Sequence, residues 1–196
     1  MKRPLLALAC LAAFGPPALA SASESGGSLH WNNGAAFATE YVWRGQSLTD
    51  GKPAIIGELK LSHDNGAYAG IWAGNLDLGP GTDTNAEIDY FLGWAKRIGQ
   101  VYVNTGYLYR QRPSDTLPLD FQEVSVFASY DIGVARVGAG SYYSWDYFQG
   151  GNSTYNYASL RVPLAKPYGV PVFAIAAAGH HDFGNRAIGN YSNVDL

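Results

Sequence analysis

The residues of this chain that could do chemistry are charged or amide side chains at alternate positions of extended runs. In chain order they are Glu40, Arg44, Glu58, Lys60, Glu87, Asp89, Asn104, Arg110, Glu123, Arg136, Asp146 and Arg161. Both signs of charge occur. If these side chains face a common interior, they create a transverse field, and rings of charge of this kind select ions in pores. The same groups could instead pair with one another and plug that interior, and the sequence leaves both interpretations open.

The remaining cluster that suggests a catalytic or metal site is His180-His181-Asp182. Adjacent residues of a strand point to opposite faces, so these two imidazoles would make a poor metal pair, and we expect the cluster to be solvated. The motifs G-x-S-x-G, P-loop and H-E-x-x-H do not occur in the sequence. We therefore predict no catalytic residues, no metal site and no cofactor, in a protein that is not an enzyme. A membrane-embedded enzyme of lipid or lipopolysaccharide chemistry is the alternative that would depend on this cluster.

Period-two alternation runs through most of the chain and predicts strands with one aromatic or aliphatic face and one small or charged face. Nine candidate strands cover residues 31–44, 54–63, 67–76, 86–97, 101–110, 121–130, 135–147, 154–164 and 170–180. Between the second and third, Asp64-Asn65-Gly66 supplies residues that tolerate a positive φ and predicts a tight hairpin. The sequence therefore predicts an all-β, antiparallel, up-and-down meander.

Strand length and loop length favour a transmembrane β-barrel over a soluble β-sandwich. The runs are about ten residues long, which a tilted strand needs to cross a bilayer, whereas strands of globular proteins cluster near 5–6 residues. Long polar connections alternate with tight ones, as in outer-membrane barrels with short periplasmic turns and longer external loops. Charged residues make up only 15% of the chain, below the usual ~25%.

Aromatic residues gather near the ends of these runs, where amphipathic rings suit the boundary between lipid and water. The predicted membrane-interface aromatics are Tyr41, Trp43, Tyr68, Trp72, Trp94, Tyr107, Tyr109, Tyr143, Trp145 and Tyr147. If the aromatic faces meet lipid, the polar residues named above line the pore, because Arg or Lys at the bilayer midplane costs roughly 2–4 kcal/mol.

The N-terminus predicts export across the inner membrane. Residues 1–20 combine a basic start, an apolar stretch and Ala18-Leu19-Ala20, which is typical of a cleaved signal peptide. Residues 21–29 are small and polar and predict a flexible lead-in, followed by a barrel domain over 30–196. The single cysteine, Cys10, lies within the signal, so the mature chain is expected to hold no disulfide.

The net charge of −3 becomes more negative once the basic signal is removed, and this argues against nucleic acid as a partner, because binding phosphates requires a basic surface. The expected partners are outer-membrane lipid and small polar solutes. The oligomeric state is left open, and a homo-oligomer is compatible with the sequence.

Four segments of the sequence also resemble a known family. They are Tyr41-Val42-Trp43-Arg44-Gly45, Thr49-Asp50-Gly51-Lys52-Pro53-Ala54, Gly70-Ile71-Trp72-Ala73 and Glu87-Ile88-Asp89. Together they resemble the TorF-type porins of proteobacteria, also described as the Gcw_chp family, most closely over residues 36–97. The resemblance implies an outer-membrane β-barrel that forms a pore, with no assigned solute. Family members continue through further strands, and bacterial single-chain barrels have an even strand number. Nine strands therefore predict a chain that is incomplete at its C-terminus, with closure by another chain as the alternative.

The function that follows is passive diffusion of small polar solutes through an outer-membrane barrel. One alternative is a soluble periplasmic barrel, lipocalin-like, that binds a small apolar ligand with the same strands turned inside out. The other is a plugged outer-membrane barrel with a structural role. The direction of four charged side chains distinguishes the membrane barrel from the soluble one. In the membrane form they point inward and in the soluble form outward; they are Glu58, Lys60, Glu87 and Asp89.

Overall fold

The computed structural model describes residues 22–26, 28–113, 117–166, 172–184 and 189–196. The predicted signal peptide, residues 1–20, lies outside the described residues. No described residue belongs to a helix long and apolar enough to cross a membrane.

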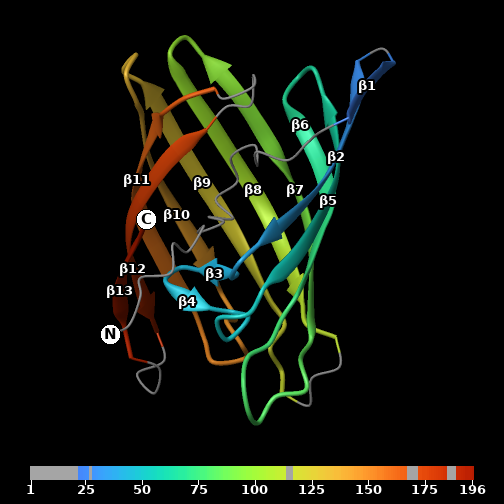
Figure 1. The fold of residues 1–196 in the computed structure, drawn as a ribbon, viewed down its shortest axis with the longest axis vertical. Coiled ribbons are helices and arrows are strands. Elements are labelled where there is room, and N and C mark those ends of the chain that lie inside the picture. Colours follow the sequence, from blue (N-terminus) through green and yellow to red (C-terminus); the bar gives the residue numbers. More distant parts are fainter. Residues whose placement is uncertain (1–21, 27, 114–116, 167–171, 185–188) are drawn as a thin grey trace.

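Eleven strands form one antiparallel sheet in the order of the sequence (Figure 1). They are β1 (Ala22–Gly26), β2 (Leu29–Ala38), β5 (Ala54–His63), β6 (Ala67–Asn75), β7 (Ala86–Ile98), β8 (Val101–Gln111), β9 (Phe121–Asp131), β10 (Arg136–Ser144), β11 (Ser153–Pro163), β12 (Phe173–Phe183) and β13 (Tyr191–Asp195). Figure 1 shows this sheet curved around a common axis. Among the described residues β1 and β13 pair only with β2 and β12, so the sheet is an open, barrel-like meander. The predicted all-β meander is confirmed.

A second, two-stranded sheet consists of β3 (Val42–Trp43) and β4 (Gln46–Ser47). It lies on the concave side of the large sheet (Figure 1). The prediction of one continuous strand over 31–44 is therefore wrong beyond Ala38. The chain leaves the sheet after β2. Arg44 and Gly45, with φ values of 51° and 76°, then close a tight two-residue hairpin of the type that needs positive φ at both central positions.

Two further strands were missed by sequence analysis. The predicted flexible lead-in, residues 21–29, instead contains β1, which pairs with β2 from Ala22 to Gly26. Residues 191–195 form β13, which pairs with β12. Both segments are short and lack a clear apolar face, and backbone hydrogen bonds to a neighbouring strand do not require one.

The connections alternate in length as predicted from β5 to β10. Tight turns follow β5, β7 and β9, and longer segments follow β2, β6, β8 and β10. The alternation predicted a further tight turn after β11 and is wrong there, because residues 164–172 separate β11 from β12. In the turn after β5 the amide of Gly66 donates to the carbonyl of His63 at 2.9 Å, and Gly66 carries the positive φ, 103°. The two ends of the sheet therefore differ, with the tight turns at one end and most of the long loops at the other.

Glycines on the concave face leave room for aromatic rings from the neighbouring strand. A Cβ on Gly93 of β7 would lie 2.5 Å from the hydroxyl oxygen of Tyr68, its cross-strand partner on β6. A Cβ on Gly140 of β10 would lie 2.6 Å from a ring carbon of Tyr157 on β11. Rings that cover glycines in this way help to fix the register and allow a sheet to curve.

Replacement of Gly140 by alanine should therefore destabilise the fold by about 1–3 kcal/mol, the usual cost of an extra methyl group in a packed interior. Gly57→Ala is the matched control, because the nearest atom to its added methyl group would be the Gly34 carbonyl oxygen at 3.9 Å. Denaturant unfolding of the refolded protein in detergent, followed by tryptophan fluorescence, measures both. Equal stability of the two variants would contradict this account of Gly140.

Candidate functional site in the lumen

The two faces of the large sheet differ in polarity, and the buried face carries the charged side chains together with aromatic and apolar ones. On the concave side Glu87, Arg110 and Glu123 have exposed fractions of 0%, 2% and 2%. On the convex side Ile55 and Leu92 are 69% and 56% exposed. In a water-soluble protein charged side chains are almost never fully buried unless paired, and large apolar side chains are most often inside. We call the space on the concave side the lumen.

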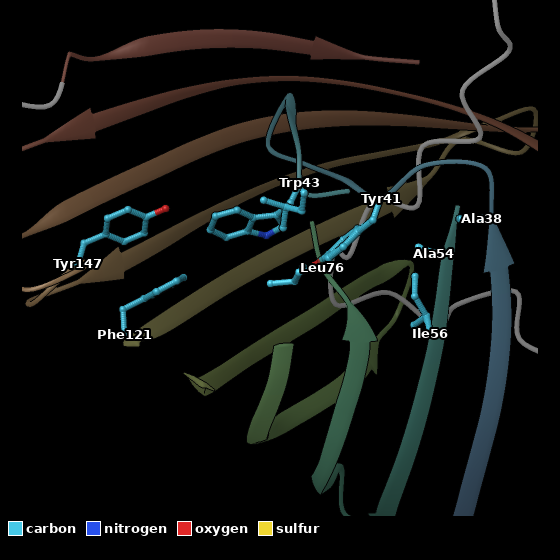
Figure 2. Close-up of a cluster of buried hydrophobic side chains, with 9 residues drawn as sticks. Ala38, Tyr41, Trp43, Ala54, Ile56, Leu76, Phe121 and Tyr147 are labelled. Carbon is cyan, nitrogen blue, oxygen red and sulfur yellow. The ribbon is translucent and has the colours of Figure 1, made fainter. Parts of the chain in front are cut away.

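The lumen hairpin, residues 41–48, projects into this space. Its base is closed by the amide of Leu48, which donates to the carbonyl of Tyr41 at 2.8 Å, and by the amide of Tyr41, which donates to the Thr49 hydroxyl at 3.0 Å. Figure 2 shows Trp43 directed from this hairpin toward Phe121 and Tyr147 on the opposite side of the interior. The hairpin therefore places its side chains in the middle of the lumen.

An ion pair fixes the tip of the lumen hairpin to β9. Arg44 donates from Nη1 and Nη2 to the two carboxylate oxygens of Glu123, each at 2.8 Å. Its guanidinium carbon also lies 4.6 Å from the ring centre of Tyr142 and 4.5 Å from that of Tyr155. A non-glycine residue with positive φ is uncommon and carries local strain. The bidentate pair and the cation–π contacts offset that strain at Arg44.

A second group of charges lies on β7, on β8 and just after β8. Arg110 donates from Nε and Nη2 to the carboxylate of Asp89 at 2.9 and 2.7 Å. Arg112 donates from Nε and Nη2 to one oxygen of Glu87 at 3.0 and 2.9 Å. Arg110 Nη2 also lies 3.3 Å from the other oxygen of Glu87. Glu87 therefore holds both guanidinium groups at once.

Tyr41 connects the base of the lumen hairpin to this group, because its hydroxyl donates to Glu87 at 3.1 Å. Burial raises the pKa of Tyr41 well above its ordinary value, and the Glu87 carboxylate raises it further. The hydroxyl therefore keeps its proton at neutral pH and remains a donor to the carboxylate.

Trp43 joins the two groups of charges. The guanidinium carbons of Arg44 and Arg110 lie 4.1 and 4.4 Å from the centre of its ring. Three arginines and three carboxylates thus form one buried network without net charge, consisting of Arg44, Glu87, Asp89, Arg110, Arg112 and Glu123. Coulomb attraction is strong at low dielectric, but burial of the charges is costly. Such a network is therefore stable only while its members remain paired.

An apolar cluster surrounds the hairpin and fills the space beside the charges. Ala38, Trp43, Leu48, Ile56 and Leu76 are buried in it. The ring centres of Phe121 and Tyr147 are 4.6 Å apart (Figure 2). Together with the ion pairs, this cluster occupies the lumen at the level of the hairpin.

Outside the lumen, the loops that follow β4 and β6 are linked by an ion pair between Lys52 and Asp77. The hydrogen bond and charge of Asp77 raise the pKa of Lys52, and the hydrogen bond from Lys52 lowers the pKa of Asp77. Both side chains therefore stay charged over a wider range of pH than they would alone, and the pair joins the exit of the hairpin to the neighbouring loop.

The structure places most of the predicted pore-lining residues on the concave side. Arg44, Glu87, Asp89, Asn104, Arg110 and Glu123 are buried there, and Glu58, Lys60, Arg136 and Arg161 are half-buried. Glu40 is half-buried in the bend that follows β2. Asp146 is an exception, because β10 ends at Ser144 and Asp146 is exposed in the following loop.

The predicted membrane-interface aromatics divide into two sets. The prediction is wrong for Tyr41, Trp43, Tyr68 and Tyr147, which are buried, and for Trp72, which packs against the interior clusters. Tyr41 and Trp43 turn inward because the chain leaves the sheet before them, and Tyr68 and Trp72 occupy concave positions of β6, where they cover glycines.

The other predicted aromatics fit a convex position. Tyr143 and Trp145 are exposed, and Tyr107 stacks on Trp145 with ring centres 6.4 Å apart. Tyr109 stacks on Tyr90 at the same distance, 6.4 Å. The half-buried Trp94 donates from Nε1 to the carbonyl of Asn65 at the tight turn, at 2.9 Å.

Sequence analysis missed Arg112. This residue lies just after β8 and beyond the predicted run 101–110, so the alternation of that run did not include it. It treated His180-His181-Asp182 as a solvated cluster, yet His181 is fully buried on β12, with Nδ1 3.2 Å from the Tyr191 hydroxyl. His180 is exposed and lies 2.9 Å from the Ser192 hydroxyl. The predicted separation of the two histidines onto opposite faces is confirmed.

The comparisons with known proteins place the chain in a family without assigning it an activity. No curated protein and no solved structure matches the chain. The family model of Gcw_chp, described as a bacterial protein of unknown function, matches residues 22–196. Because the match spans nearly the whole chain, the protein belongs to the Gcw_chp family.

Proposed function

We propose that this protein is an outer-membrane β-barrel of the TorF porin type, for passive diffusion of small polar solutes, with the lumen hairpin as its constriction. The observation that carries the proposal is the inverted polarity of the sheet, with Glu87, Arg110 and Glu123 buried and Phe37, Ile55 and Leu92 exposed. Apolar side chains that face outward over a whole sheet are favourable in lipid and unfavourable in water.

Strand length supports the same assignment. β5 has 10 residues, β8 has 11 and β9 has 11, which matches the roughly 9–11 residues of a tilted strand that crosses a bilayer. Exposed Tyr90, Tyr143 and Trp145 lie on the convex side near the long loops, where a membrane interface would accommodate them. The proposed partners are therefore outer-membrane lipid around the sheet and small polar solutes within it.

The soluble, lipocalin-like alternative is less well supported. It requires Glu58, Lys60, Glu87 and Asp89 on the outer surface, whereas Glu87 and Asp89 are buried and the other two are half-buried on the concave side. Trp43 and Trp72 do lie inside, but Trp43 stacks on the guanidinium groups of Arg44 and Arg110, and Trp72 packs on Tyr41 and the apolar cluster beside the hairpin.

The charge-neutral network supports a second candidate, a plugged barrel with a structural role. In the described structure the lumen hairpin spans from β2 to Glu123 of β9 and leaves the facing charges paired. The two candidates differ in what happens when the hairpin is removed. A pore would conduct more, and a barrel that is filled along its length would not.

Single-channel recordings in planar bilayers test the proposal. Residues 42–47 can be replaced by two glycines, because Tyr41 and Leu48 are already joined by a hydrogen bond. We expect the unmodified protein to conduct weakly and the variant to conduct several-fold more. A matched control removes residues 79–82 from the loop after β6, outside the lumen, and should leave conductance unchanged.

The contrary outcomes are distinct. A folded variant that shifts on heating in gel electrophoresis, yet conducts no more than the unmodified protein, would favour the structural barrel. Recovery of the unmodified protein as a soluble species without detergent would refute the membrane assignment altogether.

A further inference from the structure

Two arginines face each other at the tight-turn end of the lumen, away from the buried network. Arg136 of β10 and Arg161 of β11 are direct cross-strand partners. Like charges in this arrangement repel and destabilise a sheet. Neither arginine takes part in the ion pairs around the lumen hairpin.

The acid beside them compensates only part of this charge. Arg136 Nη2 lies 3.6 Å from an oxygen of Asp131, and both side chains are substantially exposed. The guanidinium carbon of Arg161 lies 3.7 Å from the ring centre of Phe173 on β12, and among the described residues it forms no ion pair within 4 Å. One positive charge therefore remains in excess.

The donors of the two side chains are also incompletely used. The Nε atoms of Arg136 and Arg161 are buried, and neither has a hydrogen-bond partner in the described part of the chain. A buried donor without a partner costs roughly 1–3 kcal/mol, and more if it is charged. Two such atoms on adjacent strands indicate a group with acceptor oxygens that would lie between them.

A cavity is present at this position. It has a volume of about 180 Å³ and is lined by both arginines, Asp131, Pro163 and Phe173, with further wall from the turn after β9. This is room for several water molecules, and so for an oxyanion of the size of phosphate with a small substituent. Phe173 and Pro163 provide an apolar wall, and the guanidinium groups provide the donors.

We propose that this arginine cavity is a binding site for a phosphate group, either as a free anion or on a lipid headgroup. Guanidinium groups present several donors in a planar fork that matches phosphate oxygens, and such charge-assisted hydrogen bonds are strong. A bound phosphate would neutralise the excess charge and satisfy the unused donors. The site goes beyond the proposed pore, since binding does not require the lumen to conduct.

The test uses the full chain, folded in a zwitterionic detergent that lacks a phosphate group. Inorganic phosphate is titrated calorimetrically at constant ionic strength against chloride. Arg161→Gln removes one of the two guanidinium groups and should weaken the binding of phosphate about tenfold or more. Arg97→Gln is the matched control, because Arg97 is exposed near the tight turn after β7 and donates to the Gln100 carbonyl at 3.4 Å. It should change binding by less than about twofold.

Thermal unfolding separates a binding role from a structural one. Arg161→Gln relieves the repulsion from Arg136, so the variant should be at least as stable as the unmodified protein without phosphate and should lose the stabilisation that phosphate provides. Arg161→Lys keeps the charge and should retain part of the binding. Loss of stability in Arg161→Gln, with no effect of phosphate on the unmodified protein, would overturn the proposal.

The source of the phosphate group is distinguished by a second ligand, dihexanoyl phosphatidic acid below its critical micelle concentration. Tighter binding of this lipid than of inorganic phosphate, lost in Arg161→Gln, assigns the site to a headgroup. Equal or weaker binding of the lipid assigns it to a free anion. Binding of neither ligand overturns the proposal, even if the barrel conducts.

Discussion

Replacement of Glu87 by glutamine is expected to destabilise the folded protein by about 3–5 kcal/mol, because it leaves buried arginines without their counter-charge. Glu87 is fully buried and contacts Arg112, Arg110 and the Tyr41 hydroxyl. Glutamine has nearly the same shape as glutamate, so the loss of stability measures the effect of the missing charge and not of a change in side-chain volume. Denaturant unfolding from lipid vesicles, followed by tryptophan fluorescence, measures the free energy of unfolding.

Glu58→Gln provides the matched control for this prediction. Glu58 lies on the concave side of β5, is only half-buried, and forms no ion pair within 4 Å among the described residues. Its replacement should change stability by less than about 1 kcal/mol. Combining Glu87→Gln with Arg112→Gln should recover part of the loss, because one uncompensated charge is removed. Similar effects of Glu87→Gln and Glu58→Gln would contradict the paired network.

Arginine in place of Val126 is expected to destabilise the protein in a bilayer by about 2–4 kcal/mol, the cost of this side chain near the midplane of the lipid. Val126 lies in the middle of β9 on the convex face and is 53% exposed. If that face met water, the same substitution would change stability by no more than about 0.5 kcal/mol. The size of the effect therefore reports which medium surrounds the sheet.

Unfolding from vesicles of defined thickness measures this effect, and Gln149→Arg is its control. Gln149 is exposed in the long loop after β10, outside the sheet, so it should tolerate arginine in either medium. A Val126→Arg variant as stable as the control would contradict a lipid-facing convex surface and with it the proposed function.

The strands that could be predicted from the sequence are those with uninterrupted alternation. The expected run 54–63 coincides with β5, and 86–97 differs from β7 by one residue. The run 31–44 continues the same alternation through Tyr41 and Trp43, yet the chain bends inward. Its turn uses Arg44-Gly45, whereas the usual signal for this hairpin is Asn-Gly or Asp-Gly.

The charged residues of the lumen could be predicted in kind but not in pairing. Glu87, Asp89 and Arg110 occupy polar positions of alternating strands, and this is enough to place them on one face. Their partners depend on register and on the position of the hairpin, because Arg44 and Glu123 are 79 residues apart. The arginine cavity depends on register in the same way, since Arg136 and Arg161 face each other only in the pairing of β10 with β11.

The contact between the lumen hairpin and β13 has a consequence for the order of folding. A side chain at Gly45 would collide with Asn193, so the tip of the hairpin fits closely against β13. Contacts between segments so far apart in sequence carry a high entropic cost of loop closure and form late. The hairpin can therefore reach its final position only after β13 has paired with β12, which makes its docking a marker that β13 is in place.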